Sequence, residues 1–208
     1  MIQPLLMEQS LSPHFARTKM TSHRWHLPLL SLLFALSLSA QDTAWQLDPG
    51  LTKVEYTLGD LLHTVHGTFA VKSGNLRFDP QNGKASGEMV VDATSGNSGN
   101  STRDRKMNRE VLESAKYPAI VFRPDHIEGR LSPQGVSQIE VHGAFEIHGA
   151  SHEITIPMQA TPADGDFKVA TQFPIPYQKW GMKNPSTLFL RVDDKVVITI
   201  HAVWKPVR

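Results

Sequence analysis

Apolar and polar residues alternate strictly from Ile139 to His148. One side of this stretch carries isoleucine, valine and phenylalanine, and the other carries glutamate and histidine. Successive side chains of a β-strand point to opposite faces, so this period of two predicts a strand with one buried and one solvent-facing side. Half-buried strands of this kind are typical of antiparallel sheets.

The same period of two recurs along most of the chain, in segments around residues 53–58, 68–72, 75–79, 88–92, 120–123, 153–159, 167–173, 188–193 and 198–205. Turn-forming runs separate several of these segments, namely Pro80–Gly83, Ala163–Gly165 and Asp193–Asp194. Short strands joined by such turns are typical of sequential hairpins. The sequence therefore predicts one all-β domain, either a sandwich or an antiparallel up-and-down barrel of about eight strands.

One segment departs from the strand pattern and predicts a short α-helix near residues 101–114. Ser101 is a plausible N-cap, and Met107, Val111 and Leu112 have helical spacing. Pro118 ends the helix, because the residue before a proline avoids the helical conformation.

The first forty residues have the order of a secretory signal peptide. Three basic residues precede an apolar stretch at 27–38, and small residues follow up to Ala40. Met20 is an alternative start, and an uncleaved N-terminal anchor is the alternative interpretation of the apolar stretch. We expect residues 1–40 to be removed, leaving a single domain at 41–208 that is periplasmic or secreted and has no stable membrane insertion.

Charge and composition exclude several classes of function. The formal net charge of +1 argues against nucleic-acid binding, and the absence of cysteine excludes disulfides, thiolate metal sites and a cysteine nucleophile. His152-Glu153 lacks the second histidine of a zinc-protease motif, and Gly96–Gly99 falls one residue short of a serine-hydrolase elbow. His142 and His148 lie too far apart on one strand to share a metal ion. We expect neither an enzyme nor a metal site.

The chain resembles the YceI-like family, bacterial exported proteins with a lipocalin-like barrel that bind polyisoprenoids and related long-chain lipids. The motifs that carry the resemblance run in order from Trp45 to Trp204 and are Trp45–Asp48, Val65–Phe69, Arg103–Met107, Tyr117–Phe122 and His142–Gly149. Two places depart from the family pattern. His152-Glu153 stands where a lysine is usual, and residues 176–186 differ from the usual C-terminal motif.

The resemblance implies an antiparallel barrel that holds a long-chain amphiphile, such as a polyisoprenoid, an isoprenoid quinone, a fatty acid or a fatty amide, for transport or storage. No permanent cofactor is expected, and the protein could act as a monomer or a homodimer. The expected apolar wall comprises Tyr56, Phe69, Phe78, Met89, Val91, Phe122, Phe145, Ile147, Ile154, Ile156, Trp180 and Leu190. The expected headgroup rim comprises Arg103, Arg105 and His152.

Three alternatives stay open. The aromatic residues could fill the core, and the protein would then act through its surface as a partner-binding or stress-response module. The run Arg103–Lys106 could form a basic rim for a headgroup, or Asp104 could cap or pair locally and fix the helix against the barrel. Trp180 could belong to a lid or could plug one end of the barrel.

Overall fold

A computed structural model describes residues 43–59, 64–186 and 192–207. The described residues form ten strands, which are β1 (Thr43–Leu47), β2 (Lys53–Gly59), β3 (Thr64–Phe69), β4 (Val71–Phe78), β5 (Ala85–Asp92), β6 (Ala119–Gly129), β7 (Ser137–Ile147), β8 (Ala150–Ala163), β9 (Asp166–Ile175) and β10 (Val196–Pro206). The predicted leader, residues 1–40, lies outside the described residues, and so does Leu190. None of the helices in the described ranges is long and apolar enough to cross a membrane.

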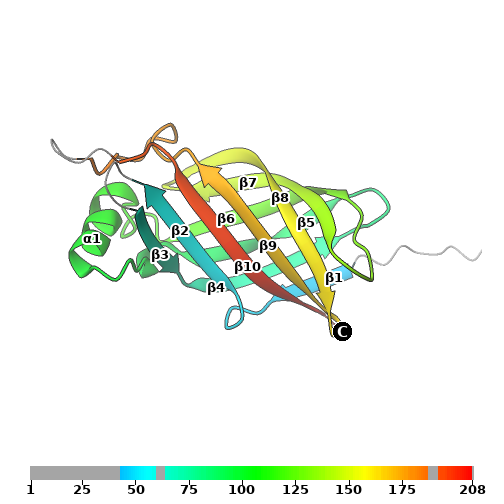
Figure 1. Ribbon diagram of the computed structural model, residues 1–208. Coiled ribbons are helices and arrows are strands. Elements are labelled where there is room, and N and C mark those ends of the chain that lie inside the picture. Colours follow the sequence, from blue (N-terminus) through cyan, green and yellow to red (C-terminus); the bar gives the residue numbers. More distant parts are fainter. Residues whose placement is uncertain (1–42, 60–63, 187–191, 208) are drawn as a thin grey trace, which may run out of the picture. The chain divides into compact units, whose positions relative to one another are not determined.

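The strands form a closed antiparallel barrel. The sheet order is β1-β4-β5-β6-β7-β8-β9-β10-β2-β3, and β1 also pairs with β10 to close a ring of eight strands. β10 pairs with β2 through Val197–His201 and with β1 through its last residues, so β2 and β1 lie one after the other along the same edge of β10 (Figure 1). The prediction of an antiparallel barrel of about eight strands is confirmed.

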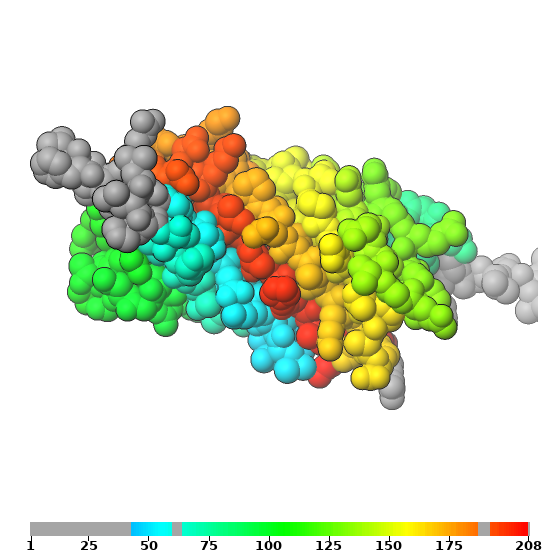
Figure 2. Space-filling view, viewed as in Figure 1, coloured from blue at the N-terminus to red at the C-terminus, as the bar shows by residue number. Residues whose placement is uncertain are grey.

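The predicted alternation governs which side chains face inward. Along β7, every second residue from Ser137 to Ile147 is buried, and the residues between them are half-buried or exposed. Phe145 pairs with Phe122 of β6 on one side and with His152 of β8 on the other. On the face shown in Figure 2, β2, β10 and β9 cover the barrel as adjacent oblique bands.

Many of the buried apolar side chains belong to one of two clusters. One gathers around Phe145, Ile156, Phe173 and Tyr177, and the other around Phe78 and residues that include Ile127 and Ile139. Both clusters contribute to the walls of the interior.

The long β5–β6 connection contains η1 (Ala93–Ser95) and the predicted helix, which is shorter than expected and changes its winding. It consists of α1 (Ser101–Lys106), followed directly by one π-helical turn, η2 (Met107–Val111). The N-cap is Asn100 rather than Ser101. Asn100 is extended, and its side-chain oxygen accepts hydrogen bonds from the backbone N–H groups of Thr102 and Arg103, so helical geometry begins only after it.

α1 lies at one end of the barrel, close to β3 (Figure 1). A β-bridge between Thr68 of β3 and Asn97 ties the loop before α1 to the barrel. At the other end of the segment, His148 in the β7–β8 turn contacts Glu113, with 3.0 Å between Nε2 and Oε2. The segment is therefore held at both of its ends.

Candidate ligand-binding cavity

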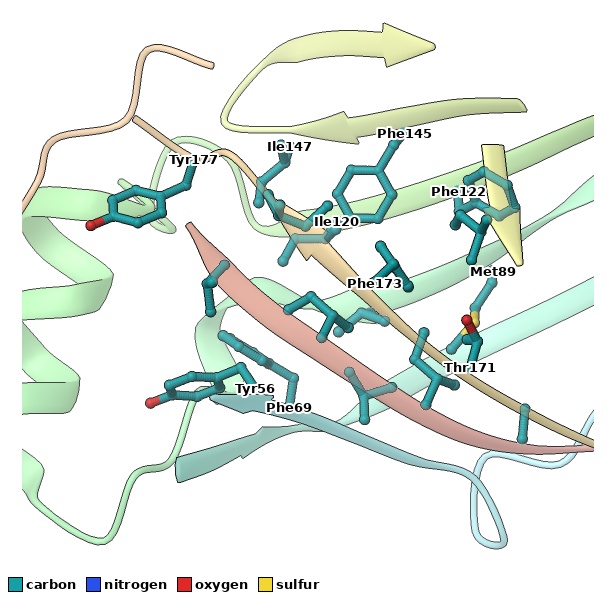
Figure 3. Close-up of a pocket in the computed structure, with 18 of the residues that line it drawn as sticks. Tyr56, Phe69, Met89, Ile120, Phe122, Phe145, Ile147, Thr171, Phe173 and Tyr177 are labelled. Carbon is teal, nitrogen blue, oxygen red and sulfur yellow. The ribbon is translucent and has the colours of Figure 1, made fainter. Parts of the chain in front are cut away.

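The barrel encloses a cavity of about 590 Å³. Its wall takes residues from all ten strands and from the α1–η2 segment, so the cavity follows the barrel interior (Figure 3). Small-molecule sites typically have volumes of about 300–1,000 Å³. The wall is predominantly apolar, and the charged residues among its described members are Glu88, Arg103 and Lys106. An elongated apolar hollow of this kind suits a molecule with a long hydrocarbon part.

Most of the wall residues expected from the sequence line this cavity, namely Tyr56, Phe69, Phe78, Met89, Val91, Phe122, Phe145, Ile147 and Ile156. The aromatic rings contact one another along the wall. The ring centroids of Tyr56 and Phe69 lie 5.4 Å apart, and Phe145 meets Phe173 edge-on at 6.3 Å. Because these contacts run around the wall, the aromatic residues bound the space without filling it.

Four of the expected site residues that the structure describes lie outside the cavity wall: Ile154, Trp180, His152 and Arg105. The imidazole of His152 stacks on the indole of Trp180 with ring centroids 4.0 Å apart and an interplanar angle of 4°. Trp180 also contacts Phe145, at 5.8 Å between centroids, and Ile154 packs against the same apolar cluster. Trp180 therefore packs against the wall residue Phe145 without lining the cavity itself.

The strand pairing of β8 explains the surroundings of His152 and Ile154. The β8–β9 ladder ends at the pair Met158 and Thr171, so the first half of β8 has no partner on β9. His152 and Ile154 belong to that unpaired half. Trp180, from the segment after β9, stacks on His152 there.

The α1–η2 segment forms one end of the cavity. Its lining members are Asn100, Thr102, Arg103, Lys106, Met107, Val111 and Leu112. The backbone N–H of Leu112 bonds to the carbonyl of Met107, five residues earlier, which is π-helical geometry. This wider turn brings Met107, Val111 and Leu112 to the same face, so all three contact the apolar interior.

Of the two arginines expected at the rim, only Arg103 lines the cavity. Its Nε and Nη2 donate hydrogen bonds of 2.8 Å to the hydroxyl and the carbonyl oxygen of Ser98. Asp104 accepts a hydrogen bond of 3.0 Å from the backbone N–H of the same serine. Arg103 and Asp104 therefore fix the helix locally. Arg105 points to Thr102, 3.2 Å from its hydroxyl, and is absent from the wall.

Two further polar residues line this end of the cavity: Lys106, which belongs to the basic run at the start of the helix, and Tyr177, which sequence reasoning missed. Lys106 lies three residues after Arg103, and this spacing places both on one helical face, which was a usable signal. Tyr177 follows β9 in an irregular segment, where no periodicity indicates its direction. It is 4% exposed, and its hydroxyl donates a 2.6 Å hydrogen bond to the carbonyl of Asp193. Burial, helped by Asp194 and Asp193, raises the pKa of Tyr177 to about 12, so it stays a neutral donor.

Comparison with known proteins identifies the family. The YceI-like domain profile matches residues 45–204. The chain belongs to the YceI-like family. No curated protein matches the sequence.

Solved structures support the same fold for this YceI-like chain. Burkholderia cenocepacia BcnA superposes with a TM-score of 0.63 at 19% identity, covering 76% of this chain and 98% of BcnA. A polyisoprenoid-binding domain from Saccharophagus degradans, implicated in plant cell wall breakdown, gives 0.64 at 16% identity, covering 79% and 99%. The Campylobacter jejuni YCEI protein gives 0.51 at 16% identity, covering 67% and 81%.

Within the described part of this YceI-like barrel, one cluster has the spacing of a metal site. Asp125, His142 and Glu153 lie on the outer face, with 2.8 Å between Asp125 Oδ1 and His142 Nδ1 and 3.8 Å between Glu153 Oε2 and His142 Nε2. Asp125 raises the pKa of His142, chiefly through this hydrogen bond. When the imidazole is protonated, His142 and the two carboxylates form an ion-pair cluster on the surface.

Proposed function

We propose that this chain is an exported lipid-binding protein that holds a polyisoprenoid or a similar long-chain amphiphile in the barrel cavity, for transport or storage. An isoprenoid quinone, a fatty acid and a fatty amide belong to the same class of ligand. The protein binds this ligand without chemically changing it. Export is inferred from the composition of residues 1–40.

The observation that carries this proposal is the cavity of about 590 Å³ with its predominantly apolar wall. Transfer of apolar surface from water into such a space stabilises a complex by about 25 cal/mol per Å², before the cost of ordering the ligand. The polyisoprenoid-binding description of the similar Saccharophagus domain supports the same ligand class. The alternative, a barrel that acts through its surface, requires a filled core. The volume of the cavity argues against a filled core.

Mass spectrometry of lipids extracted from the protein, purified without detergent from its native host, tests the proposal. We expect one long-chain amphiphile in near-stoichiometric amount. A matched pair of variants then locates it. Ile200 of β10 lines the cavity, whereas its neighbour Thr199 does not and its hydroxyl accepts a hydrogen bond from Gln172.

We predict that Ile200→Trp lowers the amount of bound lipid at least about fivefold, because the indole occupies space that the ligand needs. Thr199→Trp adds the same side chain outside the cavity and should leave the lipid content unchanged. Equal lipid content in both variants, or a protein without any lipid that also binds none when lipid is added, would contradict the proposed function.

A further inference from the structure

The charges on the cavity wall are unevenly distributed. Glu88, the one acidic residue among the described lining positions, forms an ion pair of 3.2 Å with Arg123. Arg123 itself also pairs with Glu146 and is absent from the cavity wall. The charge of Glu88 is therefore compensated by outer-face residues. The other two charged lining residues are both cations, and both belong to α1.

Of these two cations, Arg103 already has its hydrogen-bond partners. Its guanidinium binds Ser98 through two hydrogen bonds of 2.8 Å, and the N–H of Ser98 donates to Asp104. Asp104 thus offsets the charge of Arg103 through a shared serine. This arrangement holds the loop before α1 and leaves Arg103 little capacity for a ligand.

In the part of the chain that the structure describes, Lys106 has no comparable direct partner. It is half-buried at the same end of the cavity, and its Nζ donates one long hydrogen bond of 3.3 Å, to the carbonyl oxygen of Pro185. Among the described residues, no carboxylate forms an ion pair with it. Glu110, one turn further on, is engaged by Arg109 at 2.6 Å and by Lys183 at 3.7 Å.

An ammonium group has three N–H donors, so Lys106 keeps two for another acceptor. Partial burial removes part of the hydration of the ammonium group. A charge-assisted hydrogen bond to an anion offsets this lost hydration better than a bond to a neutral acceptor does. The hydroxyls of Tyr56 and Tyr177 point to the same end of the cavity, toward the helical segment (Figure 3). A head placed there meets the ammonium of Lys106 beside two neutral phenol groups, while its tail extends into the apolar interior.

We infer that the ligand is a long-chain anion, with a single carboxylate or phosphate head bound by Lys106 at the helical end of the cavity. This inference rests on the proposed function and narrows it, because a neutral quinone or amide would leave the ammonium uncompensated.

Two pairs of probes test the inference, each pair sharing a tail and differing in the charge of the head. Oleate is compared with oleyl alcohol, and geranylgeranyl phosphate with geranylgeraniol, by equilibrium dialysis against the delipidated protein. Charge-assisted hydrogen bonds change affinity by about 10- to 100-fold, so we expect the anion of at least one pair to bind at least about tenfold tighter than its alcohol. The pair with the larger preference tells a carboxylate from a phosphate.

Lys106→Met should remove this preference by weakening the anion about tenfold and the alcohol less than about twofold. Lys106→Arg should keep it. Arg105→Met is the matched control. It removes the same charge from the preceding position on α1, which lies outside the cavity wall. It should change neither affinity.

Equal affinity of anion and alcohol in both pairs would overturn the inference and leave the lipid-binding function standing. Equal weakening of both probes by Lys106→Met would show a structural role and would also overturn it. If Arg105→Met weakened anion binding as much as Lys106→Met does, the preference would come from the general positive charge of α1, and the assignment to Lys106 would be overturned. Failure of all four probes to bind would contradict the proposed function itself.

Discussion

At the scale of single residues, His152 carries the clearest energetic conflict in the barrel. Its ring is stacked on Trp180, and its Nε2 is buried without a hydrogen-bond partner among the described residues. Burial lowers the pKa of His152 below its ordinary value of 6.5, because the charged imidazolium would lose hydration that nothing replaces.

We predict that this histidine makes the protein less stable in mild acid. Since the pKa of His152 is lower in the folded than in the unfolded state, its protonation favours unfolding. Stability should therefore fall as the pH drops from about 6.5 through the lowered folded pKa, and this group should have no effect above 6.5. Urea unfolding between pH 4 and 8 measures the effect, and His152→Phe, which keeps the stack, should remove this part of the pH dependence.

His142 supplies a control of opposite sign. Asp125 raises its pKa above 6.5, so its contribution is present below 6.5 and is lost as the pH rises through the raised folded value. His142→Asn should therefore leave the acid loss caused by His152 unchanged. An acid profile that is unaltered in His152→Phe would show that this ring gains a partner or water when it is protonated.

At the scale of elements, strand parity decides the cost of a substitution. Ile156 of β8 is 2% exposed and lines the cavity, whereas the adjacent Thr155 is exposed on the outer face. We predict that Ile156→Asp destabilises the barrel by several kcal/mol, because the carboxylate has no partner inside, and that Thr155→Asp costs less than about 0.5 kcal/mol. Chemical denaturation of both variants measures the difference. Equal tolerance at the two positions would mean that the inward face of β8 is assigned wrongly.

The π-helical turn of η2 determines which side chains of the helical segment reach the cavity. A regular α-helix would spread Met107, Val111 and Leu112 over a wider arc than the π-helical turn does. The turn of η2 lets these three apolar side chains close one end of the cavity. Lys106, the last residue of α1, lines the same end. A helical segment of this length thus supplies both the apolar closure and the polar contact.

At the scale of the whole protein, the first forty residues have the composition of a cleavable leader. The leader-like composition of residues 1–40 predicts a mature chain that begins at Ala40 or Gln41. N-terminal sequencing of the protein from its native host measures this directly. Recovery of an intact 27–38 segment in the membrane fraction would contradict cleavage and would favour an anchored form.

The barrel as a whole is held together without disulfides, since the chain has no cysteine. Ring closure through the β1–β10 pair takes the place of such bonds by satisfying edges that an open sheet would expose, and the β10–β2 pair adds the β2–β3 hairpin. The interior can then stay hollow, because the wall side chains pack sideways on one another and the backbone is satisfied by its neighbours.

The strand faces, the antiparallel barrel and most of the apolar wall could be predicted from the sequence together with its family resemblance. Alternation is a local property of the chain, and each strand carries it independently of its partners, so residues such as Phe145 and Ile156 could be assigned to the interior. The presence of one short helical segment was predictable for the same reason.

Only the tertiary structure decided which polar residues reach the cavity. A helix rotates by about 100° per residue, so the docking of α1 against the barrel determined that Lys106 faces inward and Arg105 does not. The end of the β8–β9 ladder at Met158 and Thr171 determined that Trp180 packs behind the wall. Both outcomes depend on contacts between segments far apart in the chain, and a period of two or of 3.6 carries no information about such contacts.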